Sequence, residues 1–162
     1  MGDTVTGQLP AIRGGAVRGR TPYMVEASID LAQAAVDNAG ALVATDVIQC
    51  LNIPAKTVVL QAGIETMIAP LGGTTCTADL GVTGGVVDSY ADGFVVTASA
   101  AGAISAPSAD ANVVTTAADT LDLLLIGTTV DTSGTLRVWA IMQDVSEIGA
   151  TAADEVDRDT LA

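Results

Sequence analysis

Small aliphatic residues alternate with polar residues in a series of short segments along this chain. Residues 23–31 (YMVEASIDL) show the pattern most clearly, since every second side chain from Tyr23 to Leu31 is apolar and Glu26, Ser28 and Asp30 lie between them. A period of two is typical of a strand with one buried face. Gly, Pro and Asp separate such segments at intervals of about ten residues. The pattern therefore predicts an all-β fold.

The same criteria predict the other elements. A short helical turn or a loop is expected over 32–40, and strands are expected over 44–54, 57–70, 74–82, 94–99, 111–116, 121–127 and 135–145. The three strands between 44 and 82 are predicted to form an antiparallel meander. Residues 121–127 and 135–145 are predicted to form a central hairpin, with Trp139 as its largest packing element.

The segment 57–70 has two different faces. Its predicted inward face consists of Val58, Leu60, Ala62, Ile64, Thr66 and Ile68. Its outer face mixes Val59 and Met67 with Glu65. Mixed outer faces and a core with only four aromatic residues favour burial in an oligomer, for which we expect a trimer. Trp139 is expected to pack in the core or at an interface rather than to stack on a ligand.

The chain is predicted to have three parts. Residues 1–22 form an extended N-terminal arm, because seven Gly and Pro residues interrupt any periodicity. Residues 23–147 form an antiparallel β-sandwich, or jelly-roll-like, domain. Residues 148–162 form a short acidic C-terminal tail.

Charge is distributed unevenly along the chain. The net charge is −13, yet residues 1–22 carry three Arg against Asp3. The remaining residues carry eighteen acids against three bases, which is −15. Nucleic acid is excluded as a partner, since no basic face is available to neutralise phosphates. A membrane is excluded too, because no run of about 18 apolar residues occurs.

Catalytic and metal-binding motifs are missing from the sequence. There is no His, which removes His-dependent nucleophilic sites and most zinc sites. Acidic loops at Asp88 and Asp92, and at Asp119, Asp122 and Asp131, are candidates for calcium. They lack EF-hand spacing, and acidic turns ordinarily cap the backbone and face water. We expect no enzyme activity, no cofactor and no required metal.

Cys50 and Cys76 are the only cysteines. Both lie in strand-like segments with aliphatic neighbours. We expect two buried free thiols in a reducing compartment, and the sequence leaves a disulfide open.

Several segments resemble a known class of protein. DVIQCLNIPAKTVVLQAGIETMIAP, DLGVTGG, DSYADGFVV and LDLLLIGTTVDTSGTLRVWAIMQDV resemble small β-rich virion proteins of tailed bacteriophages, especially marine ones. The shared features are an IPA-x-T-V-V strand, a D-G-F segment and an L-R-V-x-A strand, within about residues 23–145.

The resemblance implies a head decoration (cement) protein. Such a protein is made in the host cytoplasm and binds the major capsid protein on the outside of the virion as a homo-oligomer, frequently a trimer. The alternatives are a tail- or fibre-associated virion protein and a carbohydrate-binding β-sandwich module. The scarcity of aromatic residues counts against the last alternative.

The arm carries the candidate partner-binding residues. Leu9 and Ile12 offer an apolar anchor, and Arg13, Arg18 and Arg20 offer guanidinium groups for carboxylates. We expect the arm to become ordered on the capsid protein or on a neighbouring subunit, where it would act as a clasp. The alternative is a solvated leader without a function.

Overall fold

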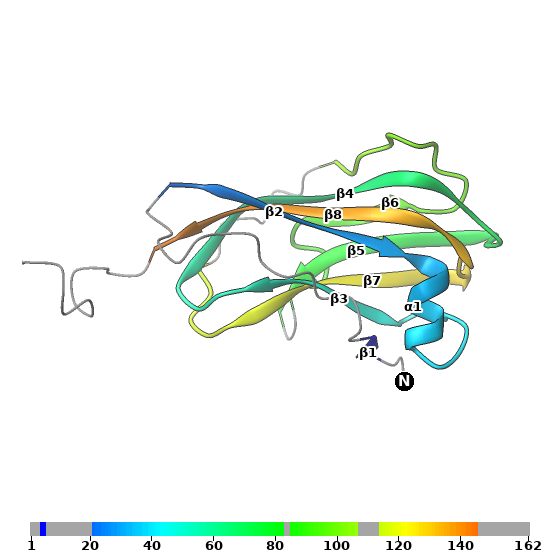
Figure 1. Cartoon of the computed structure of the whole chain (residues 1–162), viewed down its shortest axis with the longest axis horizontal. Coiled ribbons are helices and arrows are strands. Elements are labelled where there is room, and N and C mark those ends of the chain that lie inside the picture. The colour runs from blue at the N-terminus through cyan, green and yellow to red at the C-terminus, as the bar shows by residue number, and fades with distance from the viewer. Residues whose placement is uncertain (1–3, 6–20, 83–84, 107–113, 146–162) are drawn as a thin grey trace, which may run out of the picture.

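The computed structural model describes residues 4–5, 21–82, 85–106 and 114–145, and it consists of two facing β-sheets (Figure 1). The three-stranded sheet has the order β2 (Tyr23–Asp30), β8 (Ser133–Asp144), β4 (Thr57–Leu71). The five-stranded sheet has the order β1 (Thr4–Val5), β3 (Val47–Ile53), β7 (Asp119–Thr129), β5 (Thr75–Val82), β6 (Ala91–Val95). The predicted all-β sandwich is confirmed.

Apart from β6, which pairs with β5 in the five-stranded sheet, successive strands alternate between the two sheets. β2, β4 and β8 belong to the three-stranded sheet, and β3, β5 and β7 belong to the five-stranded sheet. Residues 102–105 then run along the outer edge of β4. There the Gly102 N–H donates to the Thr66 carbonyl over 2.7 Å, and the Ser105 N–H donates to the Ile64 carbonyl over 2.8 Å. With this segment as the eighth strand position, the connectivity is that of a jelly roll.

Two predicted pairings are wrong. The strands over 44–54, 57–70 and 74–82 exist but form no meander, because β3 pairs with β7 and β4 pairs with β8. The strands over 121–127 and 135–145 also exist, but they lie in different sheets and form no hairpin with each other. Alternation shows that a strand has one buried face, and it does not show which strand bonds to its edges.

Local elements follow their sequence signals. The predicted helical turn is α1 (Leu31–Asp37), whose N-cap Asp30 accepts hydrogen bonds from the Ala32 and Gln33 amides over 2.9 and 3.2 Å. The strand expected over 94–99 is displaced towards the N-terminus, as β6. Of the strand expected over 111–116, the described part contributes only an isolated bridge between Val114 and Val58.

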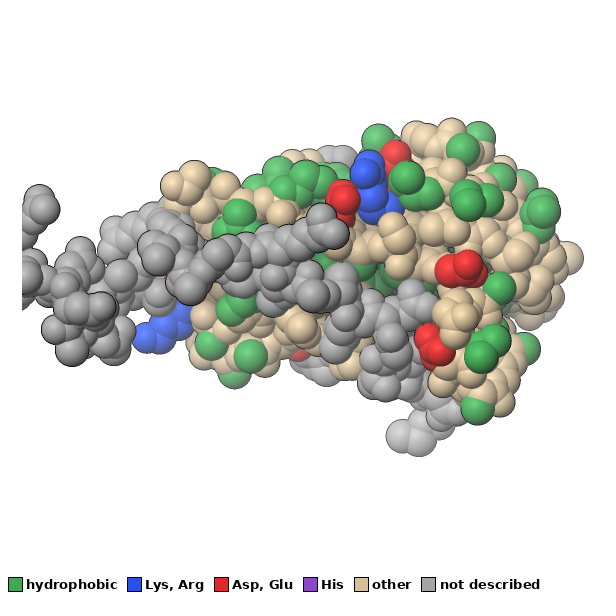
Figure 2. Space-filling model, viewed as in Figure 1, with side chains coloured by type: hydrophobic (Ala, Val, Ile, Leu, Met, Phe, Trp, Pro, Cys, Tyr) green, Lys and Arg blue, Asp and Glu red, His purple; other side chains and the backbone are tan. Residues whose placement is uncertain are grey.

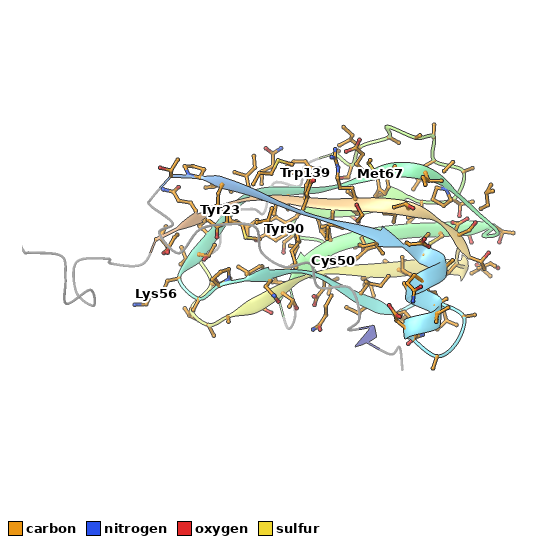
Figure 3. The ribbon with its side chains drawn as sticks, viewed as in Figure 1. Tyr23, Cys50, Lys56, Met67, Tyr90 and Trp139 are labelled. Atoms are coloured by element: carbon orange, nitrogen blue, oxygen red, sulfur yellow. The ribbon has the colours of Figure 1, made fainter. Side chains whose placement is uncertain are left out.

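The core lies between the sheets and is built from small aliphatic side chains. On β8, the four side chains that point inward are fully buried, and they are Leu136, Val138, Ala140 and Met142. Cys50 on β3 and Cys76 on β5 are buried free thiols, as expected. Burial raises the pKa of both thiols. Figure 3 shows Cys50 and Tyr90 between the two layers.

The predicted inward face of 57–70 is only partly correct. Ala62, Ile64 and Thr66 are buried as expected, but Val59 is fully buried, Leu60 is half-buried and Ile68 is 62% exposed. The register of β4 against β8 shifts between Val59 and Gln61 and again between Thr66 and Ile68. Each β-bulge changes the face on which the following residues lie. Val59 therefore contributes to the core and not to an outer face.

Most of the predicted arm and all of the predicted tail lie outside the described residues. Of residues 1–22, the structure describes 4–5 and 21–22. Thr4 and Val5 lie parallel to Val47 and Ile48 of β3, the one parallel pair among the described strands. In the described part of the chain, no helix is long and apolar enough to cross a membrane.

Candidate interaction surface

The predicted partner-binding residues are not among those that the structure describes. Leu9, Ile12, Arg13, Arg18 and Arg20 all fall in residues 6–20. The geometry that follows concerns the surface of the sandwich, where sequence patterns had singled out Trp139 and the acidic loops.

An ion-pair cluster crosses the outer face of the three-stranded sheet. Arg137 on the central strand β8 bonds to Glu65 on β4 through both Nε (2.9 Å) and Nη2, and its Nη1 lies 3.3 Å from a carboxylate oxygen of Glu26 on β2. The hydrogen bond to Glu65 raises the pKa of Arg137, and the charges of Glu65 and Glu26 add to it. The cluster links all three strands through one cation (Figure 2).

Trp139 lies on the same outer face, two residues after Arg137. Its indole is half-buried and packs over Gly63 on β4, where a Cβ would lie 2.8 Å from the ring. Only glycine leaves room for the ring at this position. Figure 3 shows Trp139 and Met67 on this sheet. Packing on the sheet surface occupies one face of the indole.

A polar network fixes the end of the sandwich where β4 turns into β5. Asp131 is 1% exposed and accepts hydrogen bonds from the Gly73 N–H (3.0 Å) and from the Thr97 hydroxyl (2.9 Å). The Thr97 oxygen in turn accepts from the Cys76 N–H over 2.8 Å. Asp131 therefore joins the β4–β5 turn, the segment after β6 and the β7–β8 turn.

A further buried acid, Asp79, lies close enough to the candidates Asp88 and Asp92 for their charges to act on it. Asp79 on β5 is 6% exposed and accepts a hydrogen bond from the Gly93 N–H over 2.7 Å. Burial raises its pKa, the bond from Gly93 opposes this, and the charges of Asp92 and Asp88 add to the rise. Within the described ranges, no group of three or more His, Cys, Asp or Glu is placed to hold a metal ion.

Sequence reasoning missed both clusters. Arg137 lies 72 positions from Glu65 and 111 positions from Glu26 along the chain. Only the strand order brings the three residues together. Asp131 was identified as an acidic loop residue, but its burial depends on three turns meeting at one end. No local signal marks either arrangement.

The comparisons with known proteins concern the fold. No family model and no curated protein matches the sequence. A chain from the capsid of Ralstonia phage GP4 has a similar structure, with a TM-score of 0.57 and 14% identity over 88% of this chain and 99% of that chain. A chain from the capsid asymmetric unit of cyanophage Pam1 has a TM-score of 0.53 and 16% identity over 83% of this chain and 92% of that chain. This chain shares their fold.

Replacing Arg137 tests the ion-pair cluster. Arg137→Ala leaves the largely buried Glu65 carboxylate without its cation, so we expect the melting temperature to fall by about 2–4 °C. Adding Glu65→Gln removes that charge and is expected to restore part of the loss, with Glu65→Gln alone as the control. The fluorescence of Trp139, the single tryptophan, monitors the same surface. A double variant no more stable than Arg137→Ala would contradict this role.

Replacing Asp79 tests its buried charge. Because its pKa is raised in the folded state, the proton is bound more tightly there, and this contribution to stability is lost as the pH rises through the raised pKa. We expect Asp79→Asn to raise the melting temperature by about 1–3 °C at pH 7 and by less near pH 4, as measured by thermal unfolding at both pH values. Asp37→Asn, which removes the same charge at an exposed position of α1, is the control. An equal gain at both pH values would contradict the prediction.

Proposed function

We propose that this chain is a non-enzymatic structural protein of a phage virion, a decoration (cement) protein that binds the outer surface of the head and stabilises it. The observation that carries the proposal is the shared fold with chains from two phage capsids. The similarity extends over almost the whole length of both partners, so it concerns a module of similar size and not a small part of a large protein. The residues that resemble tailed-phage virion proteins lead to the same class.

The described side chains fit a structural role. The buried acids hold turns together, and the buried thiols have raised pKa values, which disfavours the reactive thiolate. Tyr90 is buried, and Tyr23, Phe94 and Trp139 are half-buried, so no fully exposed aromatic platform for a sugar is present among the four aromatic residues. These features support a structural protein over the carbohydrate-binding alternative.

The proposed attachment uses charge. The residues after the arm carry −15, so they repel an acidic shell, and the arm carries the opposite charge. Arg13, Arg18 and Arg20 would bond to carboxylates of the major capsid protein, and Leu9 and Ile12 would add apolar contact. Each exposed Arg–carboxylate pair contributes about 0.5–1 kcal/mol, and more where water is excluded. The protein would act on the capsid exterior as a homo-oligomer, a trimer, after synthesis in the host cytoplasm.

A binding assay tests this function. The full chain and a chain without residues 1–20 are each mixed with undecorated phage heads over a series of salt concentrations, and the bound fraction is measured by co-sedimentation. We expect the full chain to bind and the shortened chain to bind more weakly, with a smaller dependence on salt, because three cationic contacts are lost.

The outcomes separate the parts of the proposal. Failure of the full chain to bind heads at any salt concentration would contradict the decoration function. Undiminished binding of the shortened chain with an unchanged salt dependence would contradict docking by the arm. Dissociation of the shortened chain into monomers would instead assign the arm to a neighbouring subunit, as a clasp.

A further inference from the structure

The edge strand β6 pairs with a single described neighbour, β5. The register between the two strands shifts between Ala78 and Leu80. At this shift β5 contributes one residue, Asp79, and β6 contributes two, Asp92 and Gly93. Such a β-bulge interrupts the backbone ladder of a strand that is only 5 residues long.

The side chain of Asp79 closes the ladder at this bulge. Its Oδ1 accepts a hydrogen bond from the Gly93 N–H over 2.7 Å. Gly93 has a φ of +62°, in the left-handed region that favours glycine. A titratable side chain therefore supplies the acceptor for a backbone N–H of the edge strand, where a regular pair of strands uses a carbonyl.

The residues that precede β6 lie over the outer face of β5, next to Asp79. Gly81 is two residues after Asp79 and therefore on the same face, and a Cβ at Gly81 would lie 2.3 Å from the Val86 carbonyl oxygen. The Tyr90 N–H donates to a β5 carbonyl over 2.9 Å, and the Tyr90 side chain is buried (Figure 3). Asp79 is 6% exposed. We call residues 85–95 the latch.

Acidic groups face Asp79 from the latch and from β7. Asp92 and Asp88 belong to the latch, and Asp122 on β7 lies opposite the residue two positions after Asp79. Burial raises the pKa of Asp79, the hydrogen bond that it accepts opposes this, and the charges of Asp92 and Asp88 raise the pKa further. The carboxylate is therefore both desolvated and repelled by its neighbours.

The described cations lie elsewhere. Arg137 bonds to Glu65, the one titratable residue of β4, on the outer face of the three-stranded sheet. Lys56 lies in the turn between β3 and β4. Burial and the charge of Asp119 raise the pKa of Tyr90, so its phenol stays neutral between pH 4 and pH 7. The described part of the chain therefore places no cation beside the latch.

Protonation of Asp79 removes a buried charge and leaves an oxygen to accept from the Gly93 N–H. Because its pKa is raised while the latch is closed, the proton is bound more tightly in the closed state than in an open state where Asp79 meets water. The closed state therefore gains stability as the pH falls, and it loses this stability as the pH rises through the raised pKa.

We propose that the latch is a pH-sensitive device, which stays closed over the edge of β5 when Asp79 is protonated and opens more readily when Asp79 is ionised. An edge strand with one neighbour can open while the rest of the domain stays folded, because few contacts have to break. Opening separates β6 from β5 and exposes the backbone groups along the edge of β5. The inference does not depend on the proposed function.

Amide hydrogen exchange of the full chain at pH 4 and pH 7 tests the latch, with each rate divided by the intrinsic rate at that pH. We expect the protection of the Tyr90 and Gly93 amides to be roughly 3- to 10-fold higher at pH 4, since a pKa difference of one unit corresponds to a factor of ten. At pH 7 these amides are expected to exchange faster than those of β8, the central strand of the other sheet.

Two variants separate the charge of Asp79 from its hydrogen bond. Asp79→Asn keeps an oxygen acceptor without the charge, so we expect most of the difference between the two pH values to disappear. Asp88→Asn with Asp92→Asn keeps Asp79 and lowers the repulsion, so we expect a smaller difference and slower exchange at pH 7. Asp37→Asn, at an exposed position of α1, is the matched control and is expected to change neither. Circular dichroism checks that each variant is folded.

Equal protection of the Tyr90 and Gly93 amides at both pH values would overturn the inference, as would a full pH dependence in Asp79→Asn. Exchange of the latch at the same rate as β8 would show that it opens only when the whole domain unfolds, which overturns the inference too. If Asp79→Asn does not fold, the double variant decides, because an unchanged pH dependence there contradicts the role of repulsion. Loss of the pH dependence with an unaffected control supports the inference.

Discussion

The burial of two aliphatic sheet faces against each other is the interaction on which this structure depends. With four aromatic residues in 162, the core gains its stability from many small contacts of Val, Ile, Leu and Ala, so it requires long, continuous faces on both sheets. The jelly-roll connectivity supplies them, because successive strands, apart from β6, contribute to opposite layers. This connectivity requires several turns that cross from one sheet to the other. Two of them, after β4 and after β7, meet at one end, where Asp131 bonds to Gly73 and Thr97.

Charged and apolar side chains lie in different parts of the described surface. On the outer face of the three-stranded sheet, Arg137 compensates Glu65 and Glu26. The crossing turns, by contrast, carry apolar and uncharged residues such as Ile68 and Leu71.

The sequence predicted the strands far better than their partners. Alternation located β2, β4, β5, β7 and β8, because each needs one apolar face. Alternation predicted the wrong pairing for β3, β4 and β5. The hydrogen bonds between neighbouring strands do not affect a side-chain pattern with a period of two. Val59 and Ile68 were assigned to the wrong faces because β-bulges shift the alternation. The Arg137 cluster and the buried Asp131 depend on long-range register and were not predictable.

An electron cryomicroscopy map of the native phage particle tests the proposed role most directly. The proposed function predicts density for this jelly roll on the outside of the head, as oligomers. Density for the chain in the tail, on the inner surface of the shell, or as isolated single copies would contradict that prediction.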